Sequence, residues 1–224
     1  DITMKPDCII RTNRRSMSLT ISKSGEIIVR APRKLPINKI LEFVNEKEKW
    51  IKKHLETIRQ STLINNDIKT YDACLLLGTK YKLKQFDGLK KIEFCDKEII
   101  YPLAWDKEIF KQKMKKMYKE LAQKILGERI KYFGKLMQLD YNSFAVKNYK
   151  AKWGCCSKDN NITINYKAIM LPHHVIDYII IHELCHMIEF NHSPKFYKLI
   201  EAVMPNWKKA RKDLKTYNYL IELY

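Results

Sequence analysis

Three histidines and two glutamates lie within eleven residues, from His182 to His192, of the stretch IIIHELCHMIEFNHSPKFY, which runs from Ile179 to Tyr197. His182 and His186 are four residues apart, so on a helix their imidazoles lie about 40° apart around the axis and one turn along it. Both rings can therefore reach one point. Glu183 points about 100° to one side of His182, from where its carboxylate can reach a metal-bound water without binding the metal. This H-E-x-x-H spacing suits Zn²⁺, which binds neutral imidazole nitrogens and keeps an open position for water in catalytic sites.

A catalytic zinc site needs a third protein ligand, and two candidates follow His186. Glu189 stays on the ligand face of the helix but lies a further ~4.5 Å along its axis, away from a metal held between the two histidines. His192 follows Asn191, a residue type that tolerates the left-handed conformation at a helix end, so the chain can turn back there. A Ser-Pro pair at 193–194 then starts a new helix and fixes this corner. The spacing therefore favours His192 over Glu189 as the third ligand.

The alternative interpretation is a core helix that carries polar residues by chance, since short H-E-x-x-H matches do occur without a metal. Here the apolar run VIDYIII leads directly into His182 and Glu183, so this polar pair is expected on a buried helix. Burying a glutamate without a partner is costly, which favours the metal site. The chemistry that follows is hydrolysis, with Glu183 as general base towards a metal-activated water and as proton donor to the leaving amine.

The amino-terminal part of the chain, residues 1–102, has the patterns of short strands. Apolar residues alternate on either side of a Ser-Gly turn, and later short runs are separated by glycines. Between these runs, a proline opens a stretch with helical spacing. The expected elements are a β-hairpin over 8–31, a helix over about 36–59 and short antiparallel strands over 75–102. We therefore expect a β-rich region with one helix.

The carboxyl-terminal part, residues 103–224, combines long helical patterns with two strand patterns. An apolar stripe at helical spacing begins at Phe110, and Gly127 is expected to bend or interrupt that helix. Prolines and a serine mark the starts of later helices, because Pro suits the first helical turn and Ser caps it. The expected elements are a helix over 106–138, strands over 144–149 and 162–166 joined by a polar turn, the motif helix from Pro172, a helix from Ser193 and a basic helix over 205–217.

The composition is that of a globular protein with a strong positive charge. Lys and Arg number 43 against 25 Asp and Glu, which gives a net charge of +18 spread along 224 residues. Such a field favours polyanions like nucleic acid, although a solvated lysine-rich surface gives the same balance. No apolar run approaches the ~20 residues that span a bilayer, the start DITMKPDC has no signal pattern, and six scattered cysteines suit a reducing compartment. We therefore expect a cytoplasmic protein without a membrane span.

The segments WGCCS, NITINYKAIML and IIIHELCHMIEFNHSPKFY together resemble the YgjP-like metallopeptidase family of zincins, which is more distantly related to SprT-like proteases. The similarity extends to RRSMSLTISKSGEIIVRAP and LGTKYKL, so it covers nearly the whole chain. The family's pattern is approximately W-G-S-C-S, a strand end like N-W-R, then H-E-L-x-H and N-H-S-x-x-F-W. This chain has Cys155, Tyr166 and Tyr197 where a serine and two tryptophans are usual, and none of these three changes touches the metal set.

The resemblance implies an α+β fold, with a zincin-like catalytic domain of the minimal gluzincin type in residues 103–224 and an antiparallel β-rich part before it. By position, the family's metal ligands fall on His182, His186 and His192, and its catalytic glutamate falls on Glu183. The family's fold also implies that the strand at 162–165 lies beside the zinc helix, where an extended peptide could pair with the edge of that strand.

The leading hypothesis is a zinc-dependent metallopeptidase that holds one Zn²⁺ per chain and cleaves a peptide or protein, with nucleic acid as a further partner of its basic surface. A metal-dependent nucleotide hydrolase would use the same site, but the sequence has no Gly-rich loop to hold phosphates. A nucleic-acid-binding module with structural zinc would have no use for the non-ligand carboxylate of Glu183.

Several other side chains near the motif have a role to be assigned. A donor to the oxyanion is expected in an acyl-transfer site, and the sequence offers three candidates without choosing among them: Tyr166, Tyr197 and Asn165. Two cysteines could be soft metal ligands but are more typical of buried small apolar residues: Cys156 and Cys185. His173 and His174 are expected at the surface. Trp153 and Trp207 are expected in the core or in a pocket wall.

Overall fold

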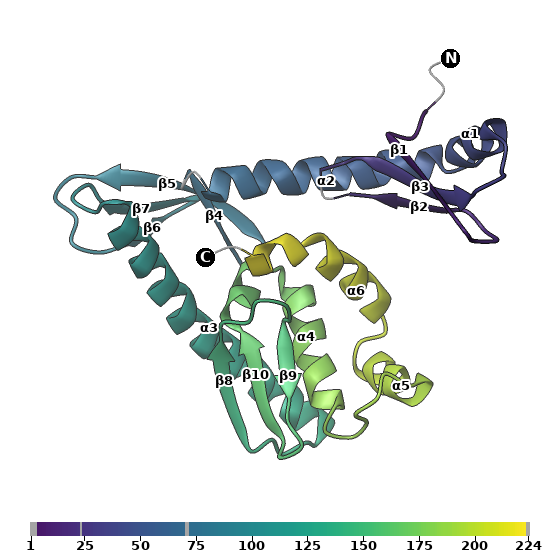
Figure 1. Cartoon of the computed structure of the whole chain (residues 1–224). Helices are drawn as coiled ribbons and strands as arrows, with labels where there is room; N and C mark the ends of the chain where they lie inside the picture. The colour runs from purple at the N-terminus through teal and green to yellow at the C-terminus, as the bar shows by residue number, and fades with distance from the viewer. Residues whose placement is uncertain (1–3, 23, 70–71, 223–224) are drawn as a thin grey trace. The chain divides into compact units, whose positions relative to one another are not determined.

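The computed structural model describes residues 4–22, 24–69 and 72–222 (Figure 1). In this part of the chain, six α-helices and three small sheets form a mixed α+β structure, which confirms the predicted fold class. The chain divides into two compact units, Asp1–Ile64 and Asn65–Tyr224. The division at residues 102/103 into an amino-terminal region and a catalytic region stays a prediction.

The first unit contains a three-stranded sheet in the order β1-β3-β2, made by β1 (Cys8–Thr12), β2 (Ser18–Ile21) and β3 (Ile27–Pro32). The predicted hairpin is confirmed, because β2 and β3 pair antiparallel across a turn that contains Gly25 with φ +90°. However, β1 runs parallel to β3, so the prediction of antiparallel strands is wrong for this pair. Side chains alternate with a period of two in both kinds of pairing, so the sequence pattern does not report strand direction.

Two helices follow this sheet where the sequence predicted one. The first, α1 (Ile37–Glu46), ends at Lys47, and α2 (Glu48–Lys69) begins immediately after it. Both helices contribute to one apolar core with the inner face of β3. The fully or nearly buried residues of this core are Ile27, Val29, Ala31, Ile40, Val44 and Ile51.

The second unit begins with a four-stranded sheet in the order β4-β5-β7-β6, made by β4 (Ala73–Leu76), β5 (Thr79–Phe86), β6 (Glu93–Cys95) and β7 (Glu98–Pro102). The pairing of β5 with β7 is parallel, so here too the antiparallel prediction is wrong in part. The β4–β5 turn approaches the segment that precedes the motif helix. The backbone nitrogens of Leu77 and Gly78 donate to the carbonyl oxygens of Ile169 and Met170 at 2.8 and 3.0 Å.

A single long helix, α3 (Lys107–Met137), runs through the second unit. The Asp106 side chain caps its start by accepting a hydrogen bond from the Ile109 nitrogen at 2.8 Å, and Gln138 ends it in the left-handed conformation. The helix passes through Gly127 without interruption, so of the two effects expected of this glycine, a bend or an interruption, the interruption is wrong. Its buried residues recur every four positions along one stripe, which packs against the motif helix and the segment before it: Phe110, Met114, Tyr118, Ala122, Leu126 and Ile130.

The second sheet of this unit has the order β8-β10-β9, with β8 (Ser143–Lys147), β9 (Gly154–Cys156) and β10 (Asn161–Asn165). The two predicted strands are confirmed as β8 and β10, which pair in parallel. Residues 154–156, predicted as part of a turn, instead form β9 antiparallel to β10. Both edges of the central strand β10 are therefore paired, and the expectation that β10 offers a free edge is wrong. The edge strand beside the motif helix is β9.

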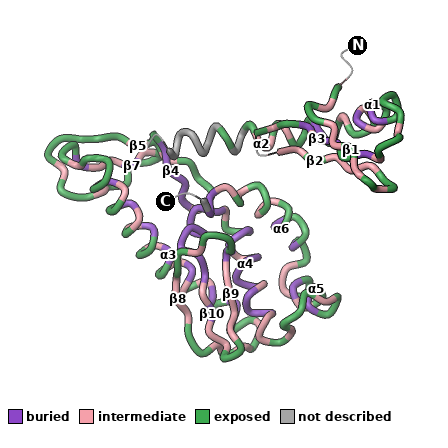
Figure 2. Tube along the Cα trace, in the orientation of Figure 1, coloured by how far each residue is buried: buried purple, intermediate pink, exposed green. Residues whose placement is uncertain are grey.

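The remaining elements are helical, and the three α-helices among them begin within two residues of their predicted starts, whereas the two 3₁₀ segments were not predicted. They are the 3₁₀ segment η1 (Tyr166–Met170), α4 (His173–Cys185), α5 (Pro194–Val203), α6 (Trp207–Thr216) and η2 (Asn218–Glu222). Figure 2 shows that burial is concentrated along α4 and the elements around it, and α4 contacts α3, α5, α6 and β9. No helix among the described residues is long and apolar enough to cross a bilayer.

Candidate active site

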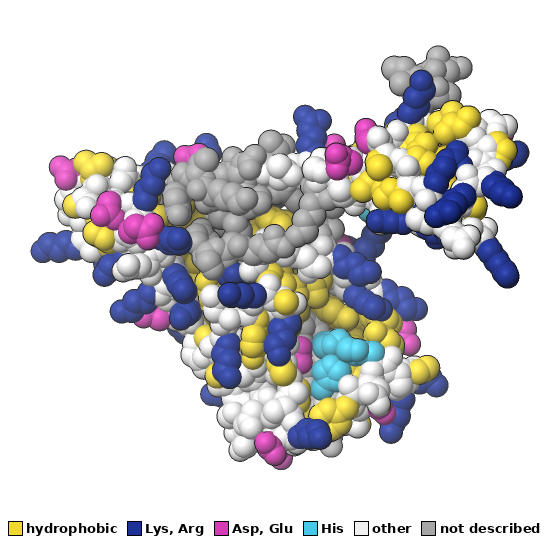
Figure 3. Space-filling view, viewed as in Figure 1, with side chains coloured by type: hydrophobic (Ala, Val, Ile, Leu, Met, Phe, Trp, Pro, Cys, Tyr) yellow, Lys and Arg dark blue, Asp and Glu magenta, His cyan; other side chains and the backbone are white. Residues whose placement is uncertain are grey.

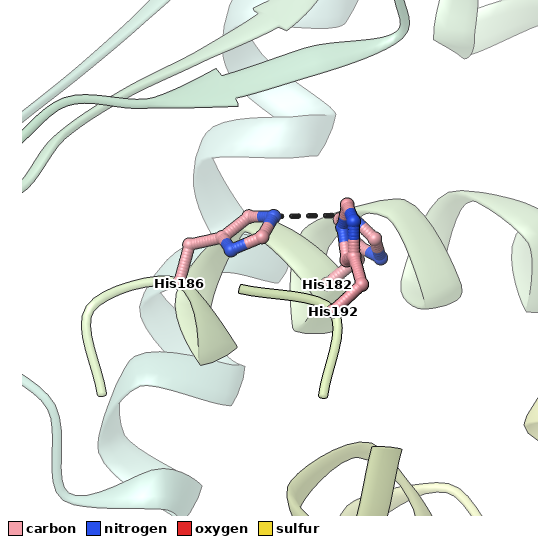
Figure 4. Close-up of side chains that lie close together, drawn as sticks. All are labelled: His182, His186 and His192. Carbon is pink, nitrogen blue, oxygen red and sulfur yellow. Dashed lines mark hydrogen bonds between the residues drawn. The ribbon is translucent and has the colours of Figure 1, made fainter. Parts of the chain in front are cut away.

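Three imidazoles converge where α4 ends and the chain turns back towards α5 (Figure 4). His182 lies in the last turn of α4, His186 is the residue that ends this helix, and His192 lies just before α5. The Nε2 atom of His182 is 3.2 Å from Nε2 of His186 and 3.0 Å from Nε2 of His192. One ring nitrogen from each of the three histidines lies within 4.8 Å of the other two. Such a set of nitrogens is suited to sharing one cation.

His182 and His186 are held in the neutral form that binds a metal. Burial lowers the pKa of His182 to about 3, and the neighbouring histidines act in the same direction. Burial also lowers the pKa of His186. Desolvation disfavours the charged imidazolium, so both rings are neutral at pH 7 and keep a lone pair for a ligand bond.

The position of Glu189 explains why its side chain does not join this group. The backbone carbonyl oxygen of Glu189 lies 3.2 Å from Nδ1 of His186, so that nitrogen donates and Nε2 is left as the acceptor. The carboxylate of Glu189 instead lies 4.0 Å from the Nζ of Lys195. Of the two candidates for a third ligand, the structure brings His192 to the other histidines, and Glu189 orients His186 through its backbone.

A phenylalanine that the sequence analysis did not single out supports the three imidazoles. Phe196 lies in the first turn of α5 and is fully buried. Its ring centroid is 4.9, 4.7 and 4.8 Å from those of His182, His186 and His192. The hydrogen bond from the Phe196 nitrogen to the Ser193 side chain fixes the start of this helix and so the place of the ring. The signal in the sequence was the phenylalanine of N-H-S-x-x-F.

Glu183 lies beside His182 on the inner side of α4 and is only 6% exposed. Burial raises its pKa to about 7, while the charge of Lys152 and a hydrogen bond from the Cys156 backbone act in the opposite direction. A carboxylate in this range can both accept and release a proton near neutral pH. The edge strand makes room for it, because a Cβ at Gly154 would lie 2.5 Å from the Oε1 atom of Glu183. The need for a glycine here could not be seen without the fold.

The three candidates for an oxyanion donor occupy different surroundings. The Asn165 amide donates to the carbonyl oxygens of Tyr149 and Lys152 at 3.0 and 3.2 Å, so it holds the loop before β9. Tyr166 is fully buried beside α3, with the Nζ of Lys119 5.9 Å from its ring. Tyr197 has its ring 6.4 Å from that of His192. Of the three, Tyr197 is the one whose ring stacks on a ring of the histidine group.

The other side chains named from the sequence lie outside that group. Burial raises the pKa of Cys156 to about 11 and that of Cys185 to about 12, so both thiols stay protonated, a form that is a poor metal ligand. His173 and His174 are exposed, as expected, and His174 pairs with Asp213 at 2.9 Å. Trp153 and Trp207 are both nearly buried, which confirms their predicted place in the core or a pocket wall.

A pocket of about 310 Å³ adjoins Glu183 and His182. Its walls come from the loop before β9, from α4, from α6 and from the start of η2. Besides Glu183 and His182, the lining residues are Lys152, Trp153, Gly154, Tyr178, Ile179, Arg211, Leu214, Lys215 and Asn218. Figure 3 shows histidine side chains gathered at one place on the surface, with Lys and Arg side chains spread over the same face. Among these eleven residues, the sequence pointed to a role or place for Trp153, His182 and Glu183, because the others meet only through the fold.

Comparison with known proteins places these features in a family. The family model described as "YgjP-like, metallopeptidase domain" matches residues 15–217. A search of curated proteins finds no match. Among solved structures, the crystal structure of the metallopeptidase zymogen of Pyrococcus abyssi abylysin is 21% identical, and the match covers 41% of this chain and 93% of that chain with a TM-score of 0.39.

Proposed function

The chain belongs to the YgjP-like metallopeptidase family, and from that premise we propose that it is a zinc-dependent peptidase with His182, His186 and His192 as metal ligands and Glu183 as general base. The observation that carries this proposal is the convergence of three imidazole nitrogens within 4.8 Å beside a nearly buried carboxylate. All four residues lie in 103–224, which we propose as the catalytic region.

The donor set fits zinc in an open site. Three neutral imidazoles are a common protein ligand set for catalytic Zn²⁺, which leaves the fourth position for water or substrate. Within the described residues, no further His, Cys, Asp or Glu side chain joins the three histidines. A structural zinc site would need such a fourth ligand, so this geometry favours the enzyme over a binding module. When bound, zinc supplies a Lewis acid and lowers the pKa of a coordinated water towards ~7.

The residues of the chain then have separate roles. Glu183 takes a proton from the attacking water and delivers it to the leaving amine nitrogen as the peptide C–N bond breaks. Its carboxylate is held for this purpose by the Cys156 backbone and by the space at Gly154. The Glu189 carbonyl oxygen keeps the Nδ1 proton of His186 away from the metal side.

The strand proposed to bind the substrate peptide differs from the strand at 162–165 that the sequence suggested. Because β10 is covered by β8 and β9, we place the extended substrate along β9, the edge strand that contacts α4. Strand edges bind peptides through backbone hydrogen bonds, and such binding requires no particular side chain.

The test is cleavage of casein and of a quenched peptide library by the zinc-loaded protein and its Glu183→Gln variant. We expect the variant to lose at least about a hundredfold in rate, the usual contribution of a general base, with zinc content unchanged. Glu189→Gln is the matched control and should retain activity. Equal residual cleavage by wild type and Glu183→Gln would refute the assignment. Turnover of nucleoside triphosphates is measured on the same variants. If this turnover depended on Glu183 and peptide cleavage did not, the result would favour a nucleotide hydrolase.

A further inference from the structure

The pocket beside Glu183 carries cations from two parts of the fold. Lys152 lies just before β9, and Arg211 and Lys215 are four residues apart on α6, so they lie on the same side of that helix. The only acidic residue in the lining is Glu183 itself. Apart from the candidate base, the charges around this pocket are therefore all positive.

Arg211 is held in place by aromatic rings. Its guanidinium carbon lies 5.3 Å from the ring centroid of Tyr197 and 5.9 Å from that of Trp207, and these two rings stack on each other at 4.8 Å. Cation–ring contacts of this kind limit the freedom of the guanidinium, so less entropy is lost when it binds a ligand. Arg211 lines the pocket together with Tyr178 and His182.

Arg211 has no carboxylate partner among the described residues, so its guanidinium can bind a ligand. Asp213, the acidic residue of α6, pairs with His174. No carboxylate in the described part of the chain lies within 4.0 Å of Arg211. Lys152, in contrast, already acts on Glu183, whose pKa its charge lowers. The cations best placed for a ligand are thus Arg211 and Lys215.

We propose that this pocket binds a carboxylate carried by the substrate residue next to the scissile bond, so that the enzyme prefers acidic peptides. The proposal rests on the peptidase function proposed above. The apolar walls made by Trp153, Ile179 and Leu214 can pack against the methylene groups of a glutamate, and the two cations bind its charged end. A carboxyl-terminal carboxylate offers the same chemistry, so the test separates a glutamate side chain from a free chain end.

The experiment uses zinc-loaded full chain and peptide pairs that differ only in charge. One pair has Glu or Gln next to the cleaved bond, and the other ends in a free acid or an amide. We expect wild type to favour at least one acidic member about tenfold in kcat/KM. Arg211→Gln should reduce that preference to about twofold or less. Lys208→Gln is the matched control, because Lys208 also lies on α6, with its Nζ 5.7 Å from the Trp207 ring, but does not line the pocket. No preference in wild type, or a preference that Arg211→Gln leaves intact, would overturn the proposal.

Two further measurements keep the test decisive. Lys215→Gln removes a pocket cation and leaves the ring contacts of Arg211 in place, so it should weaken the preference even if the Arg211 variant does not fold. Fluorescence anisotropy then measures binding of the same labelled peptides to zinc-loaded Glu183→Gln. If no peptide is cleaved but the acidic member still binds about tenfold tighter through Arg211, the pocket assignment holds and the peptidase proposal fails. Equal binding of both members would refute the pocket.

Discussion

The carboxylate of Glu183 occupies space that any side chain at position 154 would need. A Cβ there would lie 2.5 Å from Oε1 and 2.7 Å from Cγ of Glu183, closer than real Cβ contacts come. We therefore expect Gly154→Ala to push the carboxylate away from the attacking water and to lower kcat by at least about tenfold, with little change in KM. Zinc content should stay the same, since the three atoms nearest to that Cβ all belong to Glu183 and none to a proposed ligand.

Gly127→Ala is the control for this substitution. A Cβ at Gly127 would lie 3.5 Å from the Phe144 ring, which is an ordinary contact, and alanine suits the interior of α3. This variant should keep the wild-type kcat. If Gly154→Ala also kept it, the glycine would have no part in placing the base.

The choice between His192 and Glu189 can be tested by zinc binding. We expect His192→Ala to weaken zinc affinity by about a hundredfold or more, because it removes one of three converging nitrogens. Glu189→Ala keeps the backbone carbonyl that orients His186, so its affinity should stay within a few-fold of wild type. Competition with a chromophoric chelator measures both values. A variant without His192 that bound zinc normally would remove this residue from the ligand set.

The sequence predicted those site residues whose spacing along the chain is enough to determine where their side chains point. Four residues on a helix bring His182 and His186 together, and the break after Asn191 allows His192 to return, so these ligands were predicted. Phe196 touches all three rings, and Gly154 makes room for the base, but both act through contacts between separate segments. Local patterns do not report such contacts.

The motif helix is tied to its neighbour by an ion pair. Arg129 on α3 donates two hydrogen bonds to the carboxylate of Asp177 on α4, at 2.8 and 2.6 Å. Two parallel bonds fix the guanidinium and carboxylate planes relative to each other, which fixes α4 along α3. This contact therefore helps to hold the element that presents His182 and Glu183.

Arg129→Ala should lower the free energy of unfolding by roughly 1–2 kcal/mol, a value reduced from that of a fully buried pair because the arginine is partly exposed. Lys131→Ala, which removes an exposed cation two positions along the same helix, should change it by less than about 0.5 kcal/mol. Urea unfolding of these variants and of Asp177→Ala, alone and combined, measures the coupling. Additive losses from Arg129→Ala and Asp177→Ala would mean that the pair contributes nothing of its own.

Helices were more predictable than sheets for a physical reason. Prolines and capping residues mark where α4 and α5 start, and these signals act within one turn. Strand direction and neighbours depend on distant segments, so the parallel pairs β1–β3 and β5–β7 were missed. The edge strand β9 has a Gly-Cys-Cys sequence that is short and lacks alternation, so the sequence pattern predicts a turn there instead of a strand. The actual turn lies nearer Asn160, which has φ +56°.

At the scale of the whole molecule, the net charge of +18 is the property that acts beyond a single site. A field of this sign raises the local concentration of anionic partners, whether acidic peptides or nucleic acid. Nucleic acid as a partner stays a prediction. The proposal of an acidic substrate is supported by the cationic lining of the pocket beside Glu183.

Varying the salt concentration distinguishes the contribution of the pocket cations from that of the overall positive charge. Attraction between exposed charges is screened over a distance that falls from about 10 Å at ~0.1 M salt to about 3 Å at ~1 M. We therefore expect kcat/KM for the Glu peptide to fall several-fold as sodium chloride rises from ~0.05 to ~0.5 M, mainly through KM, while that for the Gln peptide stays within about twofold. In Arg211→Gln the fall should become smaller but persist, because the other Lys and Arg residues still attract the peptide. A Glu peptide cleaved equally well at both salt concentrations would show that neither the pocket cations nor the field contributes to recognition.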